Sequence, residues 1–287
     1  MTDITAKTFS SGWRLWRVAL PPRQASAKRA TQNGRWVSSR LTPWLLPALL
    51  LALWQGASAG GFLSTDILPA PSDVVKAGVT LIGNGQLSDN LLVSARRAAS
   101  GFLVGGGLAF ALGLSNGLSR LSERLTDTTV QMIRNIPNLS LIPLVILWFG
   151  IGEESKLFLT ALGVFFPVYI NTFHGVRTVD AQLVEMARSY GMSSRELFLR
   201  VIFPGALPSI FVGLRYALGV MWLTLIVAET IAANSGIGYM AMQAREFMLI
   251  DVVVLAILIY AGLGKVADST VRALERRALQ WHPAWKA

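Results

Sequence analysis

Six apolar runs, separated by short charged stretches, dominate this sequence and limit the folds that it can adopt. Only 15% of the residues are charged, whereas a soluble domain carries about a quarter, and the mean hydropathy is +0.50. This shortage of charge indicates a membrane protein. We therefore predict an all-α membrane protein with six transmembrane helices, formed by residues Trp44–Ala59, 101–117, Ile136–Ile151, Leu157–Val176, Pro204–Ala228 and Val252–Val266.

The positive charge is concentrated at the two ends of the chain. Residues 1–42 contain eight Lys or Arg and one acid, and a basic segment before a first span predicts a cytoplasmic N-terminus. We expect a disordered basic tail over 1–41, a membrane domain over 42–272 and a basic cytoplasmic tail over 273–287. We therefore interpret the net charge of +10 as a signal that keeps both ends of the chain on the cytoplasmic side, next to membrane lipid. We expect no nucleic acid as a partner. The triplet Ala57-Ser58-Ala59 matches the small-x-small cleavage site of a secretory signal peptide. The segment before it is longer than in a typical signal peptide, which favours an uncleaved first helix.

Small residues recur every four positions in two of the runs. One stripe is Gly101, Gly105, Ala109, Gly113 and Gly117, and the other is Gly205, Ser209, Gly213 and Ala217. Such a stripe lets two membrane helices approach closely. We predict that both stripes are packing faces.

A polar segment over 180–204 interrupts the apolar pattern. Asp180 is a natural N-cap for a first short helix, and Gly191 is a natural stop. Ser193 and Glu196 have the spacing of a capping box that opens a second helix. Ala187 and Gly191 lie one turn apart, so we expect an open spot where another surface could approach the backbone.

Three polar side chains within or beside the apolar runs are candidate pathway or structural residues: Asn171, Arg215 and Glu229. Arg215 lies about eleven residues into its run, roughly 16 Å along a helix, and an arginine at that depth must face protein or water. It could contact an anion, or it could pair with helix carbonyls or an acid. The third run contains Pro137 and Pro143, which predict a kinked or unwound helix.

The sequence does not contain a recognisable set of catalytic or metal-binding residues. Cysteine is absent, and His174 and His282 have no evident ligand partners, so we predict no metal site and no catalytic residues. Gly264-Lys265 is followed by Val266, which does not fit a phosphate-binding loop. We therefore expect no cofactor, and any ATP must be handled by another chain. A secondary transporter would need paired intramembrane charges, which Arg215 alone does not supply.

The 180–204 segment resembles the coupling-helix signature of ABC importer permeases. The pattern is Glu-x-Ala-x-x-x-Gly, nine residues and Val-x-Phe-Pro, with apolar departures at Met186, Val201 and Phe203. The resemblance implies a type I ABC importer transmembrane domain with a cytoplasmic coupling helix. It assigns contact with an ATPase to Glu185, Met186, Ala187, Arg188, Gly191 and Pro204.

Two further blocks resemble the nitrate, taurine and aliphatic-sulfonate class of these permeases. They run from Arg134 to Glu153 and from Leu207 to Gly238, and the segments 169–175 and 222–247 are most similar to the aliphatic sulfonate permeases. The resemblance implies a bacterial inner-membrane homodimer that works with two cytoplasmic ABC ATPase subunits and a periplasmic substrate-binding protein. It implies aliphatic sulfonates as substrates, with taurine, nitrate or another small organic anion as alternatives. Because permeases for uncharged substrates carry a similar arginine, it also favours the structural role for Arg215.

Overall fold

The computed structural model describes residues 33–64 and 67–281. Most of the expected basic tail and His282 lie outside the described residues. The chain divides into two units, residues 1–50 and residues 51–287, and the boundary falls within α1 (Asn33–Ala59). This helix begins inside the segment that was expected to be a tail.

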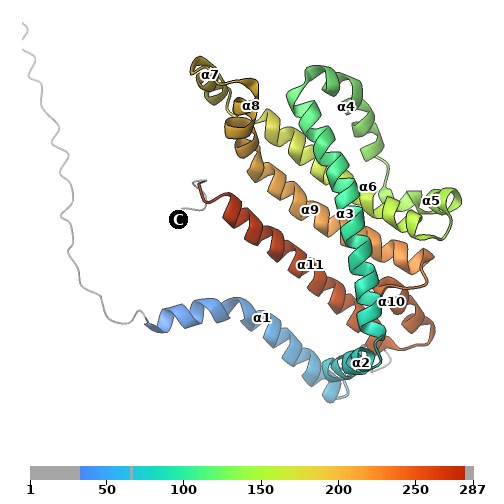
Figure 1. The fold of residues 1–287 in the computed structure, drawn as a ribbon. Coiled ribbons are helices and arrows are strands. Elements are labelled where there is room, and N and C mark those ends of the chain that lie inside the picture. The colour runs from blue at the N-terminus through green and yellow to red at the C-terminus, as the bar shows by residue number, and fades with distance from the viewer. Residues whose placement is uncertain (1–32, 65–66, 282–287) are drawn as a thin grey trace, which may run out of the picture. The chain divides into compact units, whose positions relative to one another are not determined.

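Every regular element among the described residues is helical (Figure 1). The all-α prediction is therefore confirmed. After α1 the elements are α2 (Pro71–Gly83), α3 (Gln86–Leu118), α4 (Arg120–Arg134), η1 (Asn138–Leu141), α5 (Ile142–Phe149), α6 (Glu153–Arg177), α7 (Ala181–Ser189), α8 (Ser194–Leu197), η2 (Phe198–Ile202), α9 (Phe203–Ala232), α10 (Ile237–Glu246) and α11 (Ile250–Ala278).

Four helical segments are long and apolar enough to cross a membrane, against six predicted spans. They are Gln86–Leu118, Glu153–Arg177, Ser194–Ala232 and Ile250–Ala278, and the count reaches five if the bent pair Arg120–Arg134 and Asn138–Phe149 forms one span. The apolar part of α1, Trp44–Ala59, is shorter. The last span, α11, continues as a helix into the segment 273–287.

The predicted third span, Ile136–Ile151, is not one helix. It consists of η1 and the eight-residue α5, and the pair with α4 bends by 85°. Pro137 precedes η1 and Pro143 lies in the first turn of α5. Proline lacks an N–H donor and disfavours a helical conformation in the residue before it. The predicted interruption is confirmed, and it divides the apolar run into two short helices.

The small-residue stripes hold α3, α6 and α9 together. A side chain added at Gly101 would overlap Thr160, one at Gly105 would overlap the backbone of Ala161, and one at Gly117 would overlap Val176. On the other stripe, a Cβ at Gly213 would lie 2.5 Å from the Cβ of Asn171. The stripes are close-packing faces, as predicted, because only small residues leave room for this approach.

A polar cluster ties α4 to its neighbours. The Asn116 side chain is fully buried, and its amide donates to the hydroxyl oxygens of Thr126 and Tyr169 at 2.8 Å. The Tyr169 hydroxyl donates to Asp127 at 2.7 Å, and Arg177 forms an ion pair with Glu123. These contacts fix α4 on α3 and α6.

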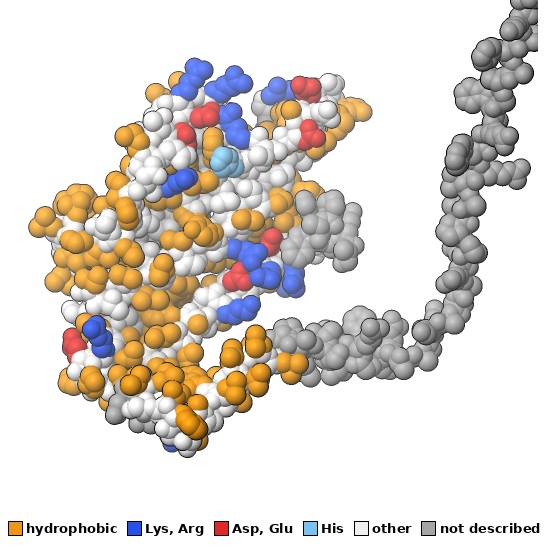
Figure 2. All heavy atoms as spheres, turned by 180° about the vertical axis from the view of Figure 1, so that it is seen from behind, with side chains coloured by type: hydrophobic (Ala, Val, Ile, Leu, Met, Phe, Trp, Pro, Cys, Tyr) orange, Lys and Arg blue, Asp and Glu red, His pale blue; other side chains and the backbone are white. Residues whose placement is uncertain are grey.

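The elements of residues 51–287 have a simple arrangement along the bundle. Helices α7 and α8 lie at the same end as the turn between α3 and α4, whereas α2 and α10 lie at the opposite end (Figure 1). Apolar side chains form a broad band across one face, and charged side chains gather at one end and in smaller clusters (Figure 2). This is the distribution expected when the middle of the bundle contacts lipid.

Candidate functional site

The polar segment 180–204 folds as its local signals predict. The Asp180 carboxylate accepts from the backbone N–H of Gln182 at 2.8 Å and caps α7. Gly191 ends this turn with φ of +76°, a left-handed conformation that glycine adopts without a Cβ penalty. Ser193 and Glu196 form a reciprocal capping box that opens α8.

The exposed face of α7 differs from the expected contact. Ala187 is only 3% exposed, so it faces its own chain and does not form an open spot with Gly191. The exposed apolar side chains are Leu183, Met186 and Tyr190, and Tyr190 is 80% exposed. They recur at spacings of three and four residues and so share one face of the helix. Glu185 and Arg188 are also exposed, and Pro204 is half-buried at the start of α9.

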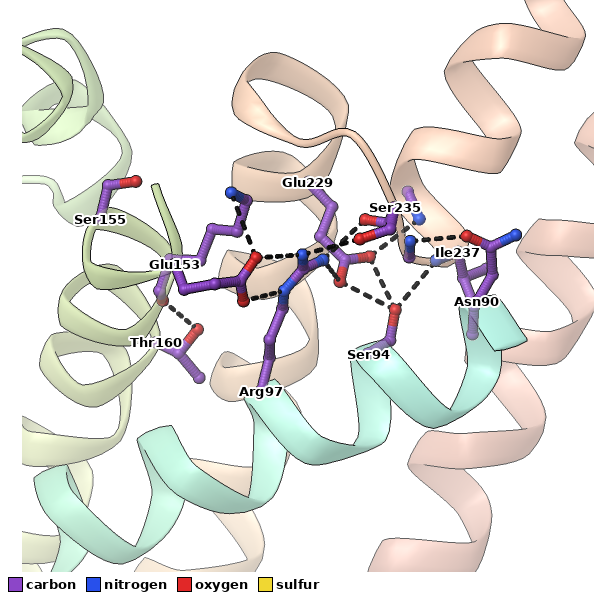
Figure 3. A network of polar contacts seen from close by, with 12 residues as sticks. Asn90, Ser94, Arg97, Glu153, Ser155, Thr160, Glu229, Ser235 and Ile237 are labelled. Atoms are coloured by element: carbon purple, nitrogen blue, oxygen red, sulfur yellow. Dashed lines mark hydrogen bonds and ion pairs between the residues drawn. The ribbon is translucent and has the colours of Figure 1, made fainter. Parts of the chain in front are cut away.

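Glu229, near the end of α9, is the centre of a buried polar network (Figure 3). Its side chain is 0% exposed and pairs with Arg97 of α3 at 2.8 Å. It also accepts from the Ser94 hydroxyl at 2.8 Å and from the Tyr260 hydroxyl at 3.0 Å. Three helices therefore converge on one carboxylate.

The same network holds the turn before α10 (Figure 3). The backbone N–H of Gly238 donates to Glu229 at 2.9 Å, that of Ile237 donates to Ser94 at 2.9 Å, and that of Gly236 donates to Asn90 at 2.7 Å. Because Glu229 is enclosed and accepts from four donor groups, it cannot contact a passing solute unless the network opens. This geometry is that of a structural anchor.

Arg97 extends the network to α6. Its guanidinium donates to Glu153 at 2.7 Å and to the Ser235 carbonyl at 2.6 Å. Lys156, only 2% exposed, donates to the carbonyls of Ile151 and Gly152 at the start of the helix. The ion pair therefore joins α3, α6, α9 and the turn before α10.

Arg215 of α9 is paired with acids of α11. Its Nε donates to Asp268 at 2.8 Å, and its Nη1 lies 3.8 Å from Glu275. Arg272 also contacts Asp268, at 3.0 Å. An arginine held by two carboxylates has little free charge to offer an anion.

Arg215→Gln should therefore weaken the α9–α11 contact without changing substrate choice. The pair is about one-third exposed, and ion pairs of this kind contribute up to about 1 kcal/mol. We expect the melting temperature of the detergent-purified protein to fall by a few degrees. The matched variant Arg277→Gln, an exposed arginine on α11 away from Asp268, should melt as the unchanged protein does. Unchanged melting of Arg215→Gln with selective loss of anionic substrates would contradict this role.

Asn171 lies in the middle of α6, where it lines a cavity of about 500 Å³ between α6, α9 and η1. Its side-chain amide donates to the Pro167 carbonyl at 2.9 Å, and its backbone carbonyl accepts from the Ser209 hydroxyl at 2.7 Å. Asn171 thus packs against α9 and also lines a cavity. The structural role and the pathway role considered from the sequence are therefore compatible.

Comparison with known proteins identifies the family. Residues 103–280, more than half of the chain, match the family of binding-protein-dependent transport system inner membrane components. The chain belongs to this family.

Individual relatives agree with this assignment of the permease. It is 60% identical to the putative aliphatic sulfonates transport permease protein SsuC of Escherichia coli (strain K12), over 89% of this chain and 97% of the relative. The protein of the same name from Bacillus subtilis (strain 168) is 44% identical over 93% of the chain and 97% of its own length. The taurine transport system permease protein TauC of Escherichia coli (strain K12) is 35% identical over 82% of the chain and 87% of its own length.

As a member of this family, the permease is a multi-pass inner-membrane protein. It is the transmembrane component of an ABC importer and works with an ATPase and a substrate-binding protein. It is a transport subunit and not an enzyme.

Sequence reasoning missed the ion pair of the permease. The expectation that the apolar runs contain no paired charges is wrong, because Arg97 of α3 and Glu229 of α9 form an ion pair. Arg97 stands in α3 only four residues before the first glycine of the stripe, and this charge inside an apolar helix was the available signal. Its partner is 132 residues away, so no local pattern could identify it.

Proposed function

We propose that this permease forms the translocation pathway for aliphatic sulfonates. The observation that carries the proposal is 60% identity to an aliphatic sulfonates permease, extending over 97% of that relative. The lower identity to the taurine permease, 35%, supports alkanesulfonates other than taurine as the substrates.

The proposed assembly is a homodimer of this chain with two cytoplasmic ATPase subunits and an external binding protein. ATP binding closes the ATPase pair, and the pathway opens outward to receive the substrate. The absence of a phosphate-binding loop in the sequence supports a separate ATPase. The basic N-terminal segment supports cytoplasmic termini.

Transport assays with the reconstituted complex test this function. Proteoliposomes would contain the permease and its ATPase, with the binding protein added outside, and the uptake of labelled butanesulfonate, taurine and nitrate would be compared. ATP-dependent uptake of butanesulfonate in preference to the other two is the expected result. Preference for taurine or nitrate would overturn the sulfonate assignment, and uptake driven by an ion gradient without ATP would overturn the importer mechanism.

The segment 180–204 is the proposed ATPase contact, through residues Glu185, Met186, Arg188 and Gly191. Two features support it. Helix α7 directly follows α6, and α8 leads through η2 into α9, so a displacement here acts on two packed helices. The exposed apolar face of Leu183, Met186 and Tyr190 offers area for a protein contact. Ala187, which is buried, supports α7 from within.

Met186→Asp should detach the ATPase from an otherwise intact permease. The side chain is 51% exposed, so we expect the change to leave the fold unaffected. Burying an unpaired neutral polar group in an apolar contact costs about 1–3 kcal/mol, and an ionised carboxylate costs more. We expect co-purification of the ATPase to fall about tenfold or more. The matched control is Met248→Asp, which changes an exposed methionine beyond α10. Equal ATPase recovery for both variants would place the contact elsewhere.

A further inference from the structure

The cavity beside Asn171 differs in the charge of its lining from two other cavities of the described residues. It lies between η1, α6 and α9, and Arg134 at the end of α4 contributes the one charged side chain to its lining. A second cavity places Arg96 and Arg97 beside Glu153 and Glu154. A third holds Asp73, Lys76 and Asp251. Of these three cavities of the described residues, the one at Arg134 has a cation without an acid.

Arg134 itself is available for a ligand. Among the residues that the structure describes, no hydrogen bond or ion pair involves its guanidinium, which is exposed. This contrasts with Arg97 and Arg215, whose guanidiniums are bound to carboxylates. A planar guanidinium pairs well with oxyanions.

Neutral hydrogen-bonding groups surround this charge. Asn138 and Asn171 line the same cavity, and so does Tyr216, whose side chain is 65% exposed. The Asn171 amide uses one N–H for the Pro167 carbonyl, and an amide nitrogen has a second N–H. The cavity can therefore offer a cation and several neutral donors to one ligand.

The opposite part of the lining is apolar. Phe166 and Ile170 of α6 and Val220 of α9 contribute to it. At about 500 Å³, the cavity falls within the range of small-molecule sites, roughly 300–1,000 Å³. It thus combines an anion-binding end with an apolar wall.

We propose that this cavity is a substrate site on the translocation pathway, in which Arg134 binds the sulfonate group and the apolar wall contacts the alkyl chain. This inference rests on the proposed function, and it names the residues of the permease that contact the anion. Asn138, Asn171 and Tyr216 complete the hydrogen bonds of the three sulfonate oxygens. An alkanesulfonate has one charged end and one apolar end, and this cavity provides a matching surface for each.

The position of the cavity suits a pathway. Gly163 and Asn171 lie about ten and eighteen residues into α6, so the cavity is roughly 15–27 Å from the start of that helix. In secondary transporters, which also work by alternating access, substrate sites lie near the middle of the bilayer. Helix α4, which ends at Arg134, contacts α6 through Asp127 and Glu123. The partner of Glu123 is Arg177, the last residue of α6, and α7 follows it directly.

Uptake measurements on Arg134 variants test the site. Proteoliposomes of the complete importer would be supplied with butanesulfonate-loaded binding protein, and both uptake and stimulated ATP hydrolysis would be recorded. We expect Arg134→Gln to reduce uptake about 10- to 100-fold, the usual effect of one charge-assisted hydrogen bond, with normal ATPase stimulation. Arg134→Lys should lie between, because it keeps the charge and loses the planar fork.

The control is Arg124→Gln, which removes an exposed arginine from the same helix outside the cavity. Its uptake should match the unchanged permease. Normal uptake by Arg134→Gln, or joint loss of complex yield and ATPase stimulation, would overturn the site. If the unchanged permease does not transport butanesulfonate, the proposed function itself fails, and that result is separate from any effect of the variants.

Discussion

Gly105→Leu should prevent α3 from packing on α6 and should cause the largest loss of stability of any change in the bundle. A Cβ at Gly105 would overlap the carbonyl oxygen and Cα of Ala161, which are backbone atoms and cannot rotate away. Overpacking costs about 1–3 kcal/mol where side chains can adjust, so we expect a cost above that range. The measurement is the melting temperature in detergent, together with the yield of monodisperse protein.

Gly107→Leu is the matched control for this prediction. It lies two residues away on the same helix, it is exposed, and a Cβ there would meet nothing within 4 Å. Its melting temperature should be close to that of the unchanged permease. Equal melting of the two leucine variants would mean that the stripe does not hold α3 against α6.

Glu229→Leu should be the most damaging change among the buried polar residues. It would leave Arg97, only 5% exposed, without its buried partner and would remove the acceptor for Ser94, Tyr260 and the turn before α10. Breaking a buried pair by removing one partner costs about 3–5 kcal/mol. We expect a strong fall in folded yield, and faster proteolysis at residues 233–238 in whatever protein remains.

A double-mutant cycle separates the pair from the volume change. Arg97→Met with Glu229→Leu removes both charges, and replacing a buried ion pair by apolar residues is often neutral or stabilising. The double variant should therefore be more stable than Glu229→Leu alone. Glu153→Gln should have a small effect, because that side chain is 65% exposed. Additive losses in the double variant would show that Arg97 and Glu229 do not stabilise each other.

Local signals in the sequence predicted the elements around the candidate coupling segment well. Asp180, Gly191 and the Ser193–Glu196 pair act through hydrogen bonds and dihedral angles within a few residues, so their spacing sufficed. The direction in which Ala187 points was not predictable in this way. It depends on how α7 is rotated against the residues that follow, and the segment's amphipathic pattern is short.

The third apolar run shows a comparable limit of the sequence. Hydropathy located the apolar run at 136–151, and its prolines indicated an interruption. The sequence did not reveal that α4, with its charged residues, pairs with the short η1 and α5 across an 85° bend. Hydropathy averages over a window and does not register the direction of the chain.

The sequence by itself determined that this chain is a helical membrane protein, where its close-packing faces lie, and that it encodes no phosphate-binding loop. These properties depend on composition and on residues a few positions apart. Only the tertiary structure decided which charges are neutralised: Arg97 by Glu229, Arg215 by Asp268, and Arg134 by none of the described residues. The physical reason is that an ion pair between helices depends on their register and rotation. In a bundle whose helices are apolar on nearly every side, hydropathy does not specify either one.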